Sequence, residues 1–157
     1  MKEMKKRVKS LVEKGFEKNY SSNEILFGKN LLTVKVALKF INNFLDTEIE
    51  LIDNSEKQGK PLIIKKLEEE LITEVNINSQ TVKFKGIADR IDSIGNITRF
   101  VDYKTGKAED KELKIEDWNA LQTEAALAKS FQLLMYAWMY NKMNPAINEN
   151  MISGIIT

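Results

Sequence analysis

The chain has 157 residues, of which 43% are hydrophobic and 30% are charged, a composition typical of a soluble globular domain. Its net charge is +1, so a nucleic-acid partner would have to be held by a local basic patch. The absence of cysteine and histidine excludes disulfides, iron–sulfur clusters, a Ser-His-Asp triad and the commonest zinc sites within this chain. No apolar run is long enough to cross a bilayer and the N-terminus is not signal-like, which predicts a cytoplasmic protein without a membrane partner.

Residues 1–60 are predicted to form a mainly helical N-terminal part. Residues 1–20 combine apolar residues at helical spacing with many lysines, which indicates an amphipathic helix. Its lysine side is either a solvated face or a surface that contacts phosphates. Residues 30–47 repeat apolar side chains at mostly helical intervals and predict a helix facing the core. Residues 53–61, "DNSEKQGKP", have the polar, Gly and Pro content of a loop.

Three successive strands are predicted within residues 68–106. The segments are "EEELITEVNI", "TVKFKGIADRIDSI" and "ITRFVDYKT", and the turn signals "NSQ" and "GN" join them. Residues 107–117 are highly charged and predict an exposed insertion.

The remaining residues are predicted to form a helix and a strand. The helix covers residues 118–143, and its buried side is marked by Leu121, Ala125, Leu127, Phe131, Leu134, Met135 and Trp138. Residues 150–157 indicate one more buried strand. The expected fold is α/β: a mixed central sheet of about four strands, flanked by the two long helices, in a single domain over residues 1–157.

Charged residues stand at the centres of two of the predicted strands. If Gly95 and Asn96 form a two-residue hairpin loop, Asp89 lies directly opposite Asp102. Lys104 lies two residues beyond Asp102 and therefore on the same face. Buried strands usually exclude charge, because an unpaired ion in the interior is costly. This cluster therefore indicates a functional site.

The same register predicts the surroundings of the cluster. Its face also carries the apolar residues Ile87, Ile91 and Phe100. The opposite face pairs Asp92 with Arg99, as a cross-strand ion pair near water. A loop over residues 78–81 would match the apolar residues of the upstream strand, Ile77 with Val82 and Val75 with Phe84. It would also place Glu74 opposite Lys85, as a weaker member of the charged cluster.

Two opposed carboxylates repel each other, and a divalent cation removes that conflict. Oxygen ligands without histidine or cysteine suit Mg²⁺ or Mn²⁺ better than Zn²⁺. Such an ion polarises a phosphoryl oxygen and lowers the pKa of a bound water, while a nearby lysine can orient that water. The pattern therefore indicates metal-assisted hydrolysis of phosphodiesters.

The motifs "GIADRID" and "FVDYKTG" resemble those of the PD-(D/E)XK nuclease superfamily, and most closely its RecB-like branch, which includes AddB-type nuclease domains. The resemblance covers about residues 70–140. It implies a restriction-endonuclease-like fold in which Asp89 and Asp102 bind the metal and Lys104 is catalytic. It also implies roles for the family's Gln-x-x-x-Tyr motif, matched by Gln132 and Tyr136. Further site residues implied in this branch are Glu74 and the backbone carbonyl of Tyr103.

Two features depart from the family pattern. Members commonly carry a histidine on an upstream helix, and many relatives hold an iron–sulfur cluster, whereas this chain has neither histidine nor cysteine. Because the sequence ends abruptly at Thr157, we expect it to be a piece of a longer chain, in which the histidine helix would lie upstream of Met1.

The expected function is a Mg²⁺-dependent deoxyribonuclease, more an exonuclease than an endonuclease, that acts in DNA recombination or repair within or beside a helicase–nuclease. Lysines of the first helix and of residues 107–114 are expected to contact the DNA backbone. The alternative is a non-catalytic DNA-binding or scaffolding module that retains the nuclease fold.

Overall fold

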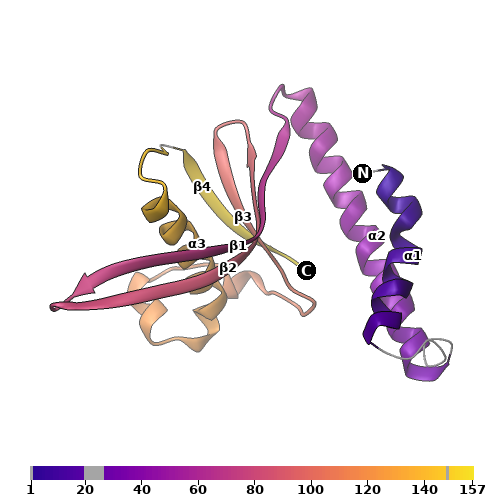
Figure 1. Cartoon of the computed structure of the whole chain (residues 1–157), viewed down its shortest axis with the longest axis horizontal. Coiled ribbons are helices and arrows are strands. Elements are labelled where there is room, and N and C mark those ends of the chain that lie inside the picture. The colour runs from indigo at the N-terminus through magenta and orange to yellow at the C-terminus, as the bar shows by residue number, and fades with distance from the viewer. Residues whose placement is uncertain (1, 20–26, 148) are drawn as a thin grey trace. The chain divides into compact units, whose positions relative to one another are not determined.

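A computed structural model of the chain describes residues 2–19, 27–147 and 149–157. These residues form three α-helices, four β-strands and short 3₁₀ turns (Figure 1). The chain divides into two compact units, Met1–Gly59 and Lys60–Thr157, where the sequence predicted one domain. None of the helices in the described residues is both long and apolar enough to cross a membrane.

The first unit is a pair of helices, α1 (Lys2–Asn19) and α2 (Gly28–Lys57). Val8 of α1 and Leu45 of α2 are buried. Both predicted helices are confirmed, but α2 continues through residues that the sequence assigned to a loop. The polar residues there are compatible with exposed helical turns, and the helix ends only before Gly59, whose φ of 67° favours glycine.

The second unit is built on a mixed sheet with the strand order β1-β2-β3-β4. Strands β1 (Leu62–Ile77), β2 (Gln80–Ile94) and β3 (Ile97–Tyr103) are antiparallel, and β4 (Asn150–Ile156) runs parallel to β3. The β1–β2 hairpin extends well beyond the other two strands (Figure 1). Strand β1 begins earlier than the sequence predicted. The predicted mixed sheet is confirmed.

The sequence predicted the turn between β2 and β3 correctly, but not the turn between β1 and β2. Gly95, with φ 59°, begins a two-residue loop, and β2 and β3 pair in the predicted register, with Ile91 opposite Phe100. The first hairpin also has a two-residue loop, Asn78 and Ser79, both with positive φ, which suits this turn type. The predicted longer loop was wrong, and so was its register. The observed pairs are Ile77 with Gln80, Val75 with Val82 and Thr73 with Phe84.

The connection from β3 to β4 crosses one side of the sheet, as a parallel pair requires. It contains 3₁₀ turns at Asp110–Glu112, Trp118–Gln122 and Ala125–Leu127, followed by α3 (Ala128–Met143). The predicted helix over residues 118–143 therefore forms only in its second part. The backbone of Glu124 is extended, with φ −96° and ψ 107°, and interrupts the helical path.

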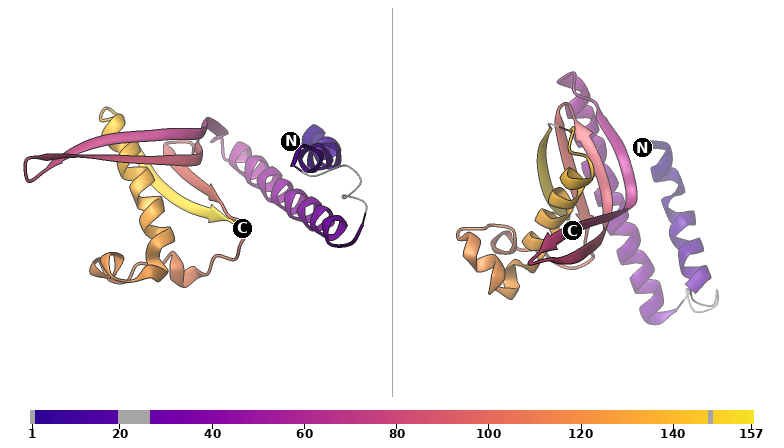
Figure 2. Two further views of the ribbon diagram at one scale, coloured as in Figure 1. Left: turned by 60° about the horizontal axis from the view of Figure 1, so that its bottom comes forward. Right: turned by 60° about the vertical axis from the view of Figure 1, so that its left-hand side comes forward.

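Helix α3 lies across one face of the sheet (Figure 2), and the core of the unit is the layer between them. That core consists of Leu71, Ala88, Ile91, Phe100, Tyr136, Met139 and Tyr140. Phe100 packs edge-on against Tyr140, with ring centroids 5.4 Å apart. The predicted buried side of the helix was partly wrong, because Phe131 is 50% exposed whereas Leu133 is buried. Most positions of this helix are apolar, so periodicity alone could not select its inner side.

Candidate active site

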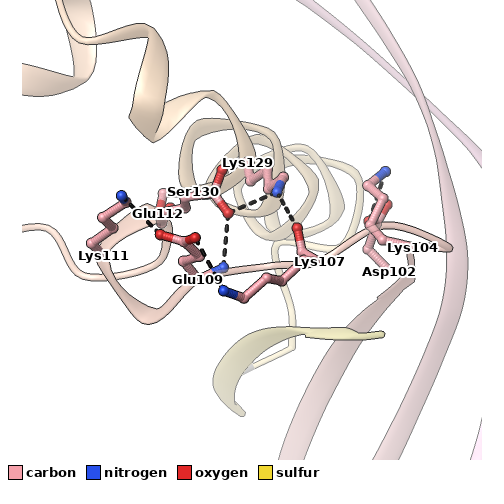
Figure 3. Close-up of polar contacts among 8 residues, drawn as sticks. All are labelled: Asp102, Lys104, Lys107, Glu109, Lys111, Glu112, Lys129 and Ser130. Atoms are coloured by element: carbon pink, nitrogen blue, oxygen red, sulfur yellow. Dashed lines mark hydrogen bonds and ion pairs between the residues drawn. The ribbon is translucent and has the colours of Figure 1, made fainter.

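The end of β3 carries Asp102 and Lys104 on the side of the sheet that α3 covers. Phe100, two residues earlier on the strand, packs in the core against α3, and strand alternation gives Asp102 the same direction. Asp102 is 3% exposed. Its Oδ2 lies 2.8 Å from Lys104 Nζ, and the two side chains lie together in Figure 3. This contact with Asp102 raises the pKa of Lys104, and the nearby charge of Asp89 adds to the effect.

The buried Asp102 Oδ2 atom accepts no hydrogen bond from any described residue. Lys104 approaches it as an ion pair, close in distance but without the angles of a hydrogen bond. A buried carboxylate oxygen normally has such a bond, so this one is under-satisfied. Its remaining capacity suits a hard cation, which prefers carboxylate oxygen.

Asp89 is bound to this same end of β3. The β2–β3 ladder stops at the pair Arg90 and Val101, one step before the predicted pair of Asp89 with Asp102. Beyond the ladder, the Asp89 carboxylate accepts a hydrogen bond of 2.8 Å from the backbone N–H of Tyr103. Since Tyr103 directly follows Asp102, this bond brings the two aspartates to one place.

The hairpin changes its inward face at Asp89. Before this residue Ala88 packs in the core beneath α3, and after it Ile91 does so, although alternation would point these two residues to opposite faces. On β1, Glu68 has a φ of 50°, and neither Glu68 nor Asp89 belongs to the β1–β2 ladder. The prediction that Ile87 shares the inward face was therefore wrong, and its side chain is 48% exposed.

Gln132 and Tyr136 lie one turn apart on α3 and contact each other. Gln132 Nε2 donates a hydrogen bond of 2.6 Å to the Tyr136 hydroxyl. Tyr136 packs directly over Gly86, where a Cβ atom would lie only 2.9 Å from the tyrosine ring. Tyr136 also contributes to the electrostatic environment that raises the pKa of Lys104. The structure thus brings this pair beside the end of β3.

Glu74 lies apart from these residues. It is exposed on β1 and lies opposite Lys83 in the ladder, not opposite Lys85 as predicted. The side chain of Lys85 forms an ion pair with Glu70. Along β1, Glu74 is six residues from Glu68, the residue level with Asp89, a separation of about 20 Å in a strand. Within the described ranges, no group of three or more Asp, Glu, His or Cys side chains could hold a metal ion.

Asp92 lies close to the site, and its burial was not predicted from the sequence. The predicted pair with Arg99 exists, at 2.6 Å between Asp92 Oδ1 and Arg99 Nε, but Asp92 is 0% exposed rather than near water. It also accepts a hydrogen bond of 2.6 Å from Arg90 Nε. The motif "DRID" contained a signal, because three charged residues flank one isoleucine in a segment, residues 86–94, that is otherwise uncharged.

The segment after Lys104 is tied to the start of α3 (Figure 3). Lys129 Nζ donates hydrogen bonds of 3.1 Å to the Lys107 carbonyl and 2.8 Å to the Glu112 carboxylate. Its bond with Glu112 lowers the pKa of that carboxyl. Ser130 Oγ donates to the Glu112 carbonyl at 2.6 Å. The crossover is therefore anchored beside the site.

Lysines predicted to contact DNA in this segment have acidic partners. Lys107 and Lys111 both pair with Glu109, and Lys114 pairs with Glu116. Their side chains remain at least 73% exposed, so these ion pairs are weak and can exchange for phosphate.

The motifs and their placement agree with the comparison to known families. The family model of the PD-(D/E)XK nuclease superfamily matches residues 2–152 of this chain. No curated protein and no solved structure gave a match. The mixed four-stranded sheet with its helices is consistent with the restriction-endonuclease-like fold of that superfamily.

Proposed function

Because this chain belongs to the PD-(D/E)XK nuclease superfamily, we propose that it is a metal-dependent nuclease that hydrolyses phosphodiester bonds in DNA. The observation that carries the proposal is the state of Asp102. Its carboxylate is buried, lacks a hydrogen bond to Oδ2 from the described residues, and lies beside Lys104. Lys104 balances its charge, but a buried carboxylate oxygen without a hydrogen bond is still costly, and a bound cation would offset that cost.

In this proposal Asp89 and Asp102 hold Mg²⁺, with the Tyr103 carbonyl as a further ligand. Two carboxylates are sufficient, because Mg²⁺ in proteins keeps several waters and is often bound through one or two carboxylates plus substrate phosphates. When bound, Mg²⁺ or Mn²⁺ supplies a Lewis acid for the phosphoryl group and makes a water more acidic.

The protein's own groups then act on the water and the phosphate. Lys104 orients the attacking water and offsets the negative charge that develops on the phosphate. Gln132 and Tyr136, which are hydrogen-bonded to each other, contact the DNA backbone from the helix side of the site. We leave Glu74 outside this set because of its distance along β1 from the level of Asp89.

We further propose that the enzyme is an exonuclease of the RecB-like branch, acting in DNA recombination or repair with a helicase partner or domain. The support is the order of the Gly-x-x-Asp, Asp-Tyr-Lys and Gln-x-x-x-Tyr motifs along the chain. An exonuclease degrades linear DNA and leaves closed circular DNA of the same sequence intact. Cleavage of the circle would instead assign an endonuclease.

The proposal is tested by a cleavage assay on single- and double-stranded DNA with Mg²⁺ or Mn²⁺, with and without chelator. Asp102→Asn should abolish cleavage while DNA binding is retained. Asp46→Asn is the matched control, because Asp46 lies on α2, its side chain is 64% exposed, and it pairs with Lys5. Cleavage that survives Asp102→Asn at the wild-type rate would reject the assigned site.

A non-catalytic DNA-binding module is the second candidate. It is favoured by the lack of a third acidic or histidine ligand near Asp89 and Asp102 among the described residues. A wild-type protein that binds DNA and never cuts it, with either metal, would decide for this candidate.

A further inference from the structure

A buried charge network lies behind the candidate active site. Asp92 is 0% exposed and Arg90 is 3% exposed. Arg90 Nε donates to Asp92 Oδ2 at 2.6 Å, and Arg99 donates to both carboxylate oxygens of Asp92, at 2.6 and 2.8 Å. Such charge-assisted bonds are short and directional, and a bidentate arginine fixes the plane of its carboxylate.

Stability alone is a weak explanation for this network. Buried ion clusters often contribute no more to folding than well-packed apolar residues of similar volume. Their clearer use is to fix one geometry. The question is therefore what Arg90 holds in place besides Asp92.

Arg90 reaches across the end of the β2–β3 ladder to Tyr103. Its Nη1 donates a hydrogen bond of 3.1 Å to the Tyr103 hydroxyl. Arg90 is also the last β2 residue paired with β3, through Val101. Beyond that pair no backbone ladder joins β2 to β3, although Tyr103 still pairs with Ile156 of β4, so contacts between β2 and Tyr103 are made by side chains.

Tyr103 is also the residue that binds Asp89. Its backbone N–H donates to the Asp89 carboxylate at 2.8 Å, and its neighbours in sequence are Asp102 and Lys104. The contacts thus run from Asp92 through Arg90 to Tyr103, and from the Tyr103 backbone to Asp89. A displacement of Tyr103 would change the spacing of the two aspartates.

We propose that Arg90, oriented by Asp92, is a positioning residue that fixes Tyr103 and thereby the Asp89–Asp102 pair. The expected effect of Arg90 on metal affinity rests on the proposed function, because it requires that Asp89 and Asp102 bind a metal ion. The positioning of Tyr103 by Arg90 does not rest on that function. Partners of this kind behind the ligands of a metal site typically change metal affinity or activity by about 10–100-fold when removed.

The test uses Tyr103→Phe in the full 157-residue chain, because this change removes only the hydroxyl that Arg90 binds. The first readout needs no metal: NMR hydrogen exchange of the backbone amide at position 103, which should become faster because its bond to Asp89 is weakened. The second readout is titration calorimetry with Mn²⁺ alone, where affinity should fall by about 10–100-fold. The unfolding midpoint should fall only slightly, because a single hydrogen bond of Arg90 is lost while the fold is retained.

Tyr140→Phe is the control, since it removes a tyrosine hydroxyl from α3 in the core, where Tyr140 packs against Phe100, and should alter neither readout. Arg90→Lys is the second variant. A lysine keeps the charge but lacks the planar fork that spans Asp92 and Tyr103, so it should reproduce the effects of Tyr103→Phe.

The outcomes separate the two proposals. Unchanged amide exchange at position 103 in a folded Tyr103→Phe protein would overturn the positioning role, and so would unchanged Mn²⁺ affinity. If the wild-type protein binds no Mn²⁺, the proposed metal-dependent function fails, and the amide readout still decides the positioning role by itself. If Arg90→Lys does not fold, Tyr103→Phe decides alone.

Discussion

Lys104 Nζ lies 2.8 Å from Asp102 Oδ2, so the two charged residues of the Asp-Tyr-Lys motif neutralise each other at the end of β3. The carboxylate is buried and the lysine side chain is 34% exposed, which leaves the ammonium group accessible to a substrate. In the proposed site, one lysine can therefore lie beside the proposed metal ligands and still face the phosphate. We therefore expect Lys104 to contribute to the rate of cleavage much more than to the affinity for DNA.

Lys104→Ala should reduce turnover by about 10²–10³, the usual loss when one preorganised electrostatic group is removed from a transition state. DNA affinity should change little, because one lysine contributes a small part of the phosphate contacts. Single-turnover cleavage and a DNA-binding titration measure the two effects. Lys142→Ala is the control, because Lys142 is exposed in the last turn of α3 and is not among the lysines expected to contact DNA. Equal losses of binding and turnover would contradict a transition-state role.

Gly86→Ala should destabilise the protein and lower its activity. The added methyl group would lie 2.9 Å from Tyr136 Cε1, so the ring and α3 have to move. Overpacking of this kind costs about 1–3 kcal/mol. Urea unfolding and the cleavage assay test the two effects. Gly154→Ala is the matched control on β4, because no atom outside its chain neighbours lies within 4 Å of the added methyl group. A Gly86→Ala protein as stable as Gly154→Ala would contradict the close packing of Tyr136.

Leu133→Ala should lower the free energy of unfolding by about 2–5 kcal/mol, because it opens a cavity at a buried leucine. Leu134→Ala, the next residue, should cost less, since Leu134 is only partly buried. Denaturant unfolding of the two variants measures the difference directly. The reverse order would mean that α3 presents a different side to the sheet.

Glu149 should contribute a pH-dependent part of the stability. Hydrogen bonds from Lys65 and Thr98 lower the pKa of Glu149 below its ordinary value of 4.5. A carboxyl with a lowered folded-state pKa stabilises the fold above its unfolded pKa, and this contribution is lost as the pH falls through the folded-state pKa. Wild type should therefore be more stable than Glu149→Gln near neutral pH, and the two should converge in acid. Urea midpoints measured across this range test the sign.

Glu74→Gln should leave cleavage unchanged. Glu74 faces Lys83 near the outer part of the hairpin, away from the end of β3. The same assay that detects the loss in Asp102→Asn provides the comparison. A loss of comparable size in Glu74→Gln would show that the hairpin brings this carboxylate to the metal pair during the reaction.

The parts of the site that local sequence chemistry determines were predictable. Gly95 specifies a tight turn, and that turn sets the observed register of β2 and β3 up to the pair of Arg90 with Val101, next to the two aspartates. The helical spacing of Gln132 and Tyr136 likewise predicted one face, and the two side chains are hydrogen-bonded.

The parts that depend on long-range packing were not predictable. The change of inward face at Asp89 follows from a bend where Glu68 has positive φ, and glutamate gives no signal for that conformation. The burial of Asp92 depends on two arginines that arrive from different strands, so the alternation pattern alone suggested a solvated pair. The turn at Asn78 lacks the glycine that usually marks a two-residue loop.

The unequal lengths of the strands have a consequence for solubility. Strand β3 pairs with β2 only over Arg90–Ile94, so the outer part of β2 is an edge with exposed backbone hydrogen-bonding groups. Such an edge can recruit a strand from another molecule and start aggregation. Lys83 and Lys85 lie on this segment, with Glu70 paired to Lys85. Their charges discourage edge-to-edge pairing, so replacing both lysines with threonine would favour self-association while leaving the site residues in place.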